Sequence, residues 1–393
     1  MDKLRIIVGG YIGLYPSGGV TWDYIQYPLG LQLLGHDVYY IEDTLQYPAY
    51  ASHYNSWDDA SASVEHLSNC MKYFGLENRW AYRDIASGKT YGIPEDKVKE
   101  LCKTADLFIN ISAANELGED FLNIPIRILI DSDPMFTQVQ NWDDKNPESA
   151  FESIKYSYQR YTHLFTFGEN IGMEDCLIPT LGLQWHPTRQ PICLNHWQAN
   201  FSHSKSGFTT VMNWAARKKI KYNEIEWGQK DIEFQKFIDI PANLPEVEFN
   251  IVVSRPTNSS DSFNIQKINE NRWNVLEPSK TINSVLDYKT FIIKSKCEFS
   301  VAKETYVKSR SGWFSCRSAC YLATGRPVIT QDTGWSKYYP TGKGLFAFTT
   351  KEEAIMAIRE VNSNEEFHQK EAIEIAHNFF DSNKVLSHLI NRL

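Results

Sequence analysis

Apolar residues near the start of the chain form a short continuous run at residues 4–8, which is typical of a buried β-strand. A glycine-containing loop follows. Residues 21–34 then carry apolar side chains at helical spacing, and Gly35 ends this helix. A second strand is predicted at residues 37–41. Together, this strand, loop, helix and strand form the opening unit of a doubly wound α/β sheet.

The same pattern continues through the first half of the chain. Apolar runs bounded by polar turns predict further strands at residues 106–111, 126–130 and 164–167. Helices are predicted around residues 61–73 and 97–105, within and after a polar, aromatic region. Because helical spacers separate the strands, we expect a parallel sheet with both faces covered.

Prolines, polar side chains and weak periodicity between residues 187 and 207 predict a linker. A second alternation of apolar runs and helical spacers follows it. Its strands are predicted at residues 208–212, 248–253, 273–276, 297–301, 328–329 and 344–348. Its helices are predicted at residues 226–238, 282–294, 316–323, 351–361, 364–380 and 381–393.

These two alternations predict an α/β protein with two facing Rossmann-like, doubly wound domains. The chain of 393 residues is long enough for two domains of ordinary size. We expect the first domain at residues 1–190, the linker at 191–206 and the second domain at 207–380. A ligand would then bind in the cleft between the domains.

Composition narrows the partners and the compartment. The net charge of −8 argues against a basic face for non-specific nucleic-acid binding. No apolar run reaches the ~18–20 residues of a membrane span, and the N-terminus enters a strand without a signal-peptide core. The seven cysteines form no C-x-x-C pair, so we expect neither a zinc ribbon nor a disulfide framework. A reducing, cytoplasmic location is the expectation.

The segment at residues 310–334, RSGWFSCRSACYLATGRPVITQDTG, predicts a turn, a short helix, a buried strand and a polar loop. A helix N-terminus offers free amides and a positive dipole end, which together bind phosphate. Gly312 would let the backbone approach a ligand closely, and the Arg310 guanidinium would fork onto phosphate oxygens. The predicted phosphate ligands are Arg310, Ser311, Gly312, Trp313 and Ser315, with added charge from Lys303 and Lys308.

This layout, from SGW through GRPVI to QDTG, resembles the donor-site segment of GT-B glycosyltransferases. The resemblance implies that the helix N-terminus holds the diphosphate of a nucleotide sugar. Arg310 stands where many inverting members have histidine, and Ser318 stands where many have a ribose-binding glutamate. It also implies that the first domain binds the acceptor and that residues 381–393 cross back to it. The residues expected to meet the donor sugar or nucleotide are Asn213, Trp214, Trp273, Gln331, Asp332 and Thr333.

Sugar transfer requires a stabilised leaving diphosphate and a deprotonated acceptor hydroxyl. The candidates for the general base are Asp23, Asp131, Asp133 and His186. The sequence DSD at 131–133 matches D-x-D literally, but Pro134 marks a strand-end turn in the half that lacks the donor segment. We therefore predict no metal site, since a helix N-terminus with Lys or Arg can replace a metal. Inversion and retention both stay open.

The predicted function is metal-independent transfer of a sugar from a nucleotide-diphosphate sugar to a hydroxyl on a small molecule, glycan or macromolecule. The nucleotide sugar is a co-substrate, and no separate cofactor is expected. Two alternatives are a sugar-nucleotide epimerase of the same architecture and a non-catalytic nucleotide- or glycan-binding protein. The glycines at 9–19 lack G-x-G-x-x-G spacing, which disfavours a dinucleotide site. Neither a G-x-S-x-G elbow nor a P-loop occurs.

Overall fold

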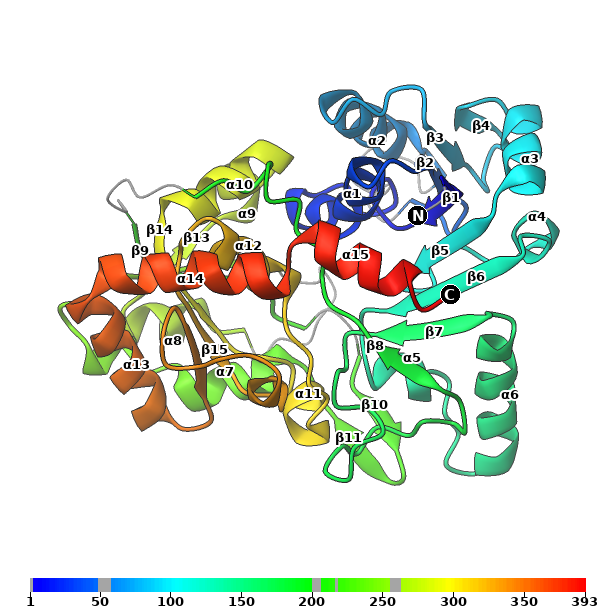
Figure 1. The fold of residues 1–393 in the computed structure, drawn as a ribbon. Coiled ribbons are helices and arrows are strands. Elements are labelled where there is room, and N and C mark those ends of the chain that lie inside the picture. Colours follow the sequence, from blue (N-terminus) through cyan, green and yellow to red (C-terminus); the bar gives the residue numbers. More distant parts are fainter. Residues whose placement is uncertain (1–2, 49–57, 200–205, 216–217, 255–262) are drawn as a thin grey trace.

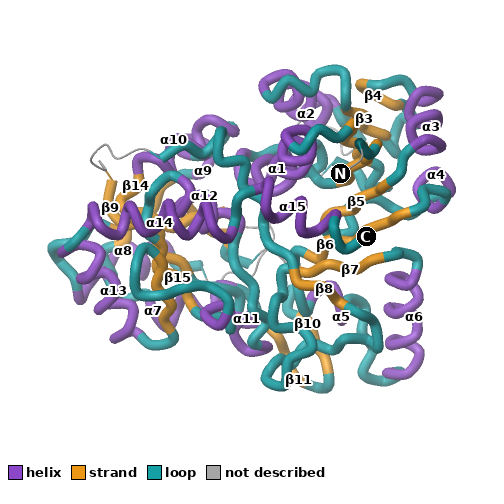
Figure 2. The backbone as a smooth tube through the Cα atoms, viewed as in Figure 1, coloured by secondary structure: helices purple, strands orange, loops and turns teal. Residues whose placement is uncertain are grey.

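The structure is a computed structural model that describes residues 3–48, 58–199, 206–215, 218–254 and 263–393. It has two α/β halves, each built on a sheet with helices packed around it (Figures 1 and 2). This arrangement confirms the predicted α/β class with two Rossmann-like halves.

The first half contains a sheet whose strands lie in the order β4-β3-β2-β1-β5-β6-β7-β8. Neighbouring strands are parallel except for the pair β3 and β4. The central strand β5 is buried along its whole length, as expected for a strand that helices cover on both faces. The bounds are β1 Arg5–Gly9, β2 Asp37–Glu42, β3 Trp80–Arg83, β4 Thr90–Gly92, β5 Leu107–Ile111, β6 Ile126–Asp131, β7 His163–Thr166 and β8 Trp185–Pro187.

The second half contains a parallel sheet with the strand order β13-β12-β9-β14-β15-β16. The chain reverses its direction of progress beside β9, and ligands of such sheets bind at the carboxyl ends of the strands near this point. The bounds are β9 Ser206–Asn213, β12 Phe249–Ser254, β13 Trp273–Leu276, β14 Ser295–Ser300, β15 Val328–Gln331 and β16 Leu345–Phe348. A separate hairpin consists of β10 Ile220–Tyr222 and β11 Ile225–Trp227.

The helices follow the strands as in other doubly wound folds. In the first half they are α1 Gly18–Leu33, α2 Ser61–Tyr73, α3 Glu95–Thr104, α4 Glu119–Leu122, α5 Phe136–Val139 and α6 Pro147–Gln159. In the second half they are α7 Lys230–Phe237, α8 Ile265–Glu270, α9 Pro278–Thr281, α10 Val285–Lys294, α11 Glu304–Ser309, α12 Cys316–Ala323, α13 Lys351–Ser363 and α14 Glu365–Phe379. The last helix is α15 Ser382–Ile390.

Helix α1 contacts the second half and the C-terminal helix. The Trp22 indole N–H donates to the Val285 carbonyl of α10 at 3.1 Å. Gly30 lies against Ser382 and Leu386 of α15. Figure 1 shows α14 along the second half and α15 continuing from it towards α1. The chain thus crosses between the halves a second time before it ends.

One hydrophobic core runs through both halves. Ile6 and Trp22 of the first half belong to the same buried cluster as Tyr288 and Tyr321 of the second half. The halves are therefore joined by apolar burial along α1, α10, α12 and α15, in addition to polar contacts.

One predicted helix starts at the wrong place. Residues 226–238 were expected to be helical, but α7 begins only at Lys230, and the residues before it form the β10–β11 hairpin. Its turn residues Asn223 and Glu224 have φ of 52° and 62°, as in a type I′ turn. Asn-Glu lacks the glycine that usually marks such a turn, so the local sequence did not reveal it. Strands β3 and β4 were also missed, in a stretch expected only to be polar and aromatic.

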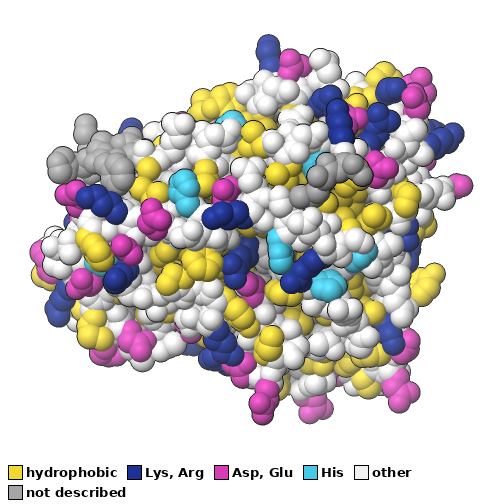
Figure 3. Space-filling view, viewed as in Figure 1, with side chains coloured by type: hydrophobic (Ala, Val, Ile, Leu, Met, Phe, Trp, Pro, Cys, Tyr) yellow, Lys and Arg dark blue, Asp and Glu magenta, His cyan; other side chains and the backbone are white. Residues whose placement is uncertain are grey.

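On the face shown in Figure 3, Lys and Arg side chains are interspersed with Asp and Glu. No helix in the described ranges combines the length and apolar character that crossing a bilayer requires.

Candidate active site between the two sheets

The carboxyl end of β6 meets the carboxyl end of β14. Asp133 accepts hydrogen bonds from the Lys303 ammonium, at 2.7 Å, and from the Tyr306 hydroxyl. The Trp313 indole N–H donates to the Ser132 carbonyl at 3.1 Å. The structure thus brings Asp133, a candidate for the general base, together with Lys303 and Trp313, which were both predicted to serve the diphosphate.

The Gly312 turn forms a joint between the halves. Gly312 has φ +77°, and a Cβ there would lie 2.7 Å from the Asn170 backbone nitrogen. The Asn170 amide donates to the Ser311 carbonyl at 3.1 Å, and the Gly312 amide donates to the Thr333 carbonyl at 2.8 Å. The Ser311 side chain is buried and bonds the Tyr306 carbonyl. The expectation that Ser311 and Gly312 bind diphosphate therefore does not fit, because protein groups already occupy them.

The three residues predicted to hold the donor sugar bond within the second half instead. Gln331 bridges the Ala302 amide and the Glu233 carboxylate. Asp332 caps the turn after it by accepting from the amide of Gly334. Thr333 donates to the Trp313 carbonyl at 2.7 Å. Each role is structural.

Arg310 and Lys308 lie at the surface. The Arg310 guanidinium pairs with Asp175 of the first half at 2.7 Å, and 47% of its side chain is exposed. Lys308 is also exposed and donates to the Glu226 carbonyl. The geometry does not support a diphosphate role for either residue, since each is engaged away from the β14 end.

Of the residues predicted to contact the nucleotide, two are buried in the core and one is exposed at the carboxyl end of a strand. Trp273 is buried, stands at the amino end of β13, and donates to the Ile238 carbonyl at 2.7 Å. It is a core residue, so its predicted contact with a base does not fit. Trp214 is also buried, against Phe234. Asn213 is exposed at the carboxyl end of β9, where a ligand could reach it.

Two candidates for the general base lie in settings that do not suit that role. Asp131 is fully buried and accepts hydrogen bonds from Thr137, Gln138 and Thr166, which anchor the strand end. His186 stands on β8 beside a hollow of about 410 Å³ that Arg392 also lines. Burial lowers the pKa of His186, and the nearby Arg392 lowers it further.

The N-terminus of α12 has free backbone donors. In the described part of the chain, no hydrogen bond is made by the amides of Cys316, Arg317 and Ser318. Ser315 precedes them as the N-cap residue without a capping side-chain bond. The Ser318 hydroxyl is buried and has no partner among the described residues. This helix end can therefore take up an anion.

The side chain of Arg317 is held in place beside this helix end. It donates to Glu298 and, at 2.7 Å, to the Ser300 hydroxyl. Glu298 is fully buried, and its second oxygen has no hydrogen-bond partner in the described residues. The pair fixes a guanidinium at the carboxyl end of β14.

Lys230 supplies a second cation at this place. The residue is 8% exposed, and within the described chain its ammonium has no hydrogen-bond or ion-pair partner. Burial lowers its pKa well below the usual value, and the nearby charge of Arg317 lowers it further. Glu298 opposes this shift, and Lys303 adds to it. An ammonium in a largely buried side chain that makes no hydrogen bond or ion pair is costly, and an anionic ligand would stabilise it.

Asp23 of α1 lies across from the α12 end. The residue is exposed to solvent, and partial desolvation by the nearby protein raises its pKa to about 6. A hydrogen bond from Cys316 and the charge of Arg317 act in the opposite direction. An acid with a pKa near neutrality, beside a cationic site, is suited to proton transfer.

Within the described ranges, no three His, Cys, Asp or Glu side chains converge in a way that could hold a metal ion. The positive groups at this site come from Lys230, Arg317, Lys303 and the α12 helix end.

Sequence reasoning missed Lys230 and Arg317. Arg317 lies inside the segment at residues 310–334, but the predicted phosphate ligands were residues of the turn before the helix. Lys230 is the first residue of α7 and follows Gly228 and Gln229, so the available signal was a lysine at a helix N-terminus shortly after a glycine. Because the hairpin was not predicted, the helix was expected to begin at residue 226, and Lys230 was not recognised as its first residue.

Several solved structures resemble the chain. HepE of Anabaena, in complex with UDP and glucose, is 11% identical with a TM-score of 0.58, covering 99% of this chain and 100% of that chain. Sucrose-phosphate synthase of Thermosynechococcus elongatus is 11% identical with a TM-score of 0.54, covering 100% and 99%. TarM is 10% identical with a TM-score of 0.46, and the match spans 78% of this chain and 60% of TarM.

No family model and no curated protein matches the chain. HepE and sucrose-phosphate synthase match it from end to end. Together with the two parallel sheets and the crossing C-terminal helix, this similarity shows that the chain has the GT-B fold of nucleotide-sugar glycosyltransferases.

Proposed function

We propose that the protein is a glycosyltransferase that moves a sugar from a nucleotide-diphosphate sugar to a hydroxyl acceptor. The observation that carries this proposal is the 8% exposed Lys230, whose ammonium has no hydrogen-bond or ion-pair partner among the described residues, together with nearby Arg317 and the free amides of α12. These groups lie at the carboxyl edge of a sheet whose fold suits ligand binding there. They match the doubly charged leaving group of such a reaction.

The similar structures support the donor class. HepE was solved with UDP and with UDP-glucose. A uridine diphosphate sugar is therefore the first donor to test, with a hexose as the transferred group.

The residues at the site divide the work. Lys230, Arg317 and the α12 amides stabilise the diphosphate as it leaves. Asp23 accepts the proton of the attacking hydroxyl if the transfer inverts. Asp133 is already bound to Lys303 and Tyr306, so we assign it the role of ordering the strand ends and give the role of base to Asp23. Because protein cations neutralise the leaving group, the reaction proceeds without a metal.

The test begins with thermal shifts on UDP, UDP-glucose and other nucleotide sugars, followed by release of nucleoside diphosphate with and without sugar acceptors. Acceptor-dependent release is the expected result. Interconversion of the donor sugar without an acceptor would show an epimerase instead. Binding without turnover would show a non-catalytic protein. EDTA should leave the rate unchanged.

We also place the protein in the cytoplasm. Its seven cysteines are all free thiols, which supports a reducing compartment.

A further inference from the structure

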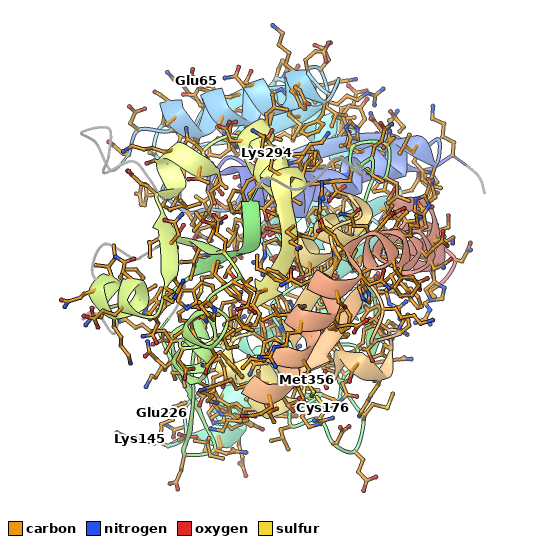
Figure 4. All side chains as sticks on the ribbon, turned by 90° about the vertical axis from the view of Figure 1, so that its left-hand side faces the viewer. Glu65, Lys145, Cys176, Glu226, Lys294 and Met356 are labelled. Carbon is orange, nitrogen blue, oxygen red and sulfur yellow. The ribbon has the colours of Figure 1, made fainter. Side chains whose placement is uncertain are left out.

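The β10–β11 hairpin belongs to the second half by sequence, but its tip lies against the first half. The rings of Trp142 and Tyr222 meet edge to face with centroids 4.8 Å apart. The Lys221 ammonium lies 3.5 Å from Asp144, whose oxygens also accept from the Glu224 amide at 3.4 Å. Figure 1 places β10 beside α5, and Figure 4 shows Glu226 of the hairpin at the same end of the molecule as Lys145.

The base of the hairpin is buried in the first half. Trp227 is 2% exposed and belongs to an apolar cluster with Met135 and Val139. Ile220 packs against the same cluster. Because α5 follows Asp133 directly, the hairpin binds the part of the first half that carries the Asp133–Lys303 contact.

Only two residues separate Trp227 from Lys230, and both are held. The Gly228 amide donates to the Glu304 carboxylate at 2.8 Å. The Gln229 carbonyl accepts from the Glu304 amide at 3.3 Å. The connection between the hairpin and Lys230 is therefore short and hydrogen-bonded to α11, so the lysine stands at a fixed distance along the chain from the buried base of the hairpin.

We propose that Trp142 and Tyr222 are positioning residues for Lys230: their contact seats the hairpin on the first half and thereby sets where the ammonium stands in the anion site. The inference rests on the proposed function, because it takes Lys230 as a ligand of the diphosphate. If this is so, Trp142 of the first half contributes to nucleotide affinity although it does not contact the nucleotide.

The first test is UDP affinity, measured by calorimetry, for Trp142→Ala and Trp142→Phe. Trp142→Ala should weaken UDP binding by about 3–10-fold, the lower part of the range for coupled neighbours. Trp142→Phe keeps an aromatic edge for Tyr222 and should restore affinity to within about two-fold. Tyr91→Ala, a half-buried tyrosine on β4, is the matched control and should lower stability while leaving UDP affinity unchanged.

The second test is a double-mutant cycle with Lys230→Met. If the hairpin acts through Lys230, Trp142→Ala has no further effect on UDP affinity once Lys230 is replaced. Wild-type affinity in Trp142→Ala, or fold-changes that multiply in the double variant, would overturn the proposal.

A third measurement does not depend on the proposed function. Hydrogen exchange of the peptide covering residues 227–232 should accelerate in Trp142→Ala but not in Tyr91→Ala. Unchanged exchange would refute the positioning role even if UDP binds. If the wild type binds no nucleoside diphosphate, the proposed function fails, while the exchange result still decides whether the hairpin holds this segment.

Discussion

At the scale of single residues, Lys230 is the clearest sign of function. Lys230 is 8% exposed, and its ammonium has no partner among the described residues, so desolvation of its charge destabilises the folded chain. Proteins retain such groups at sites where a ligand supplies the missing charge. Replacing Lys230 should therefore stabilise the ligand-free protein and weaken the binding of an anionic ligand.

Lys230→Met should weaken UDP binding by about 10–100-fold, or ~1.5–3 kcal/mol, the scale of a charge-assisted hydrogen bond. The same change should raise the melting temperature of the ligand-free protein, since methionine fills the space without charge. Calorimetric titration and thermal unfolding measure the two effects.

The control for this variant is Arg310→Met, which removes an exposed cation from the originally favoured segment. It should leave UDP affinity within about two-fold, because surface ion pairs contribute little. Loss of affinity in Arg310→Met with none in Lys230→Met would return the diphosphate to the Gly312 turn.

If the transfer inverts, Asp23→Asn should slow it by about 10²–10⁴-fold, the usual share of a general base, with UDP affinity retained. A base works when deprotonated, and desolvation raises the pKa of Asp23 to about 6. The wild-type rate should therefore increase as pH rises through about 6, and Asp23→Asn should lose that limb. Rates at saturating donor and acceptor across pH 5 to 8 measure this.

The same pKa shift predicts how the contribution of Asp23 to folding stability changes with pH. Because the folded pKa lies above the model value of 3.8, the folded state binds the proton more tightly than the unfolded state does. The stability from Asp23 is present below pH 3.8 and is lost as pH rises through about 6. Asp23→Asn should thus raise the melting temperature at pH 7 but not near pH 4; equal gains at both would contradict the assignment.

At the scale of elements, α1 joins the halves through its first turn. Its N-terminus approaches α10 so closely that a Cβ on Gly18 would collide with the Ser284 carbonyl oxygen. Glycine is required there for close packing and not for backbone conformation, since the φ of Gly18 is not positive. The interface between α1 and α10 therefore tolerates no added atom at this point.

Gly18→Ala should lower the free energy of unfolding by about 1–3 kcal/mol, as expected for overpacking at a tight contact. Gly118→Ala is the matched change, because nothing lies within 4 Å of a Cβ there, and it should fall within about 0.5 kcal/mol of wild type. Urea unfolding measures both. Equal effects would show that α1 and α10 do not pack closely in solution.

At the scale of the whole molecule, the shared core makes the halves interdependent. Residues of α1, α10, α12 and α15 lie in one buried cluster that extends across the boundary between the sheets. Cutting the chain at the linker would expose that surface on both sides. Domains that share only a small interface can unfold separately. Because these halves share one buried cluster, we expect them to unfold together.

Thermal unfolding should therefore show one transition, with the calorimetric enthalpy equal to the van't Hoff enthalpy. A fragment covering residues 1–190 should not fold stably alone. Two separated transitions in scanning calorimetry would contradict this expectation and would show two autonomous domains.

Most strands and helices could be predicted because burial on both faces leaves nearly continuous apolar runs, as in β5 and β12. The predicted site residues fared unevenly. Asp133, Lys303 and Trp313 do meet, because the carboxyl ends of β6 in the first sheet and β14 in the second sheet face each other. Gly312 and Thr333 were misread because a free amide and one bonded to a distant carbonyl look alike in sequence.

The amino-acid sequence alone determined the α/β class, the two-fold alternation and the segment from which the anion site is partly built, since each depends on local apolar spacing and turn chemistry. Only the tertiary structure decided which donors stay free. Asn170 and Thr333 occupy the Gly312 turn, whereas Lys230 and the α12 amides keep their hydrogen-bonding capacity for a ligand. That choice depends on contacts between residues far apart in the chain, which local patterns do not encode.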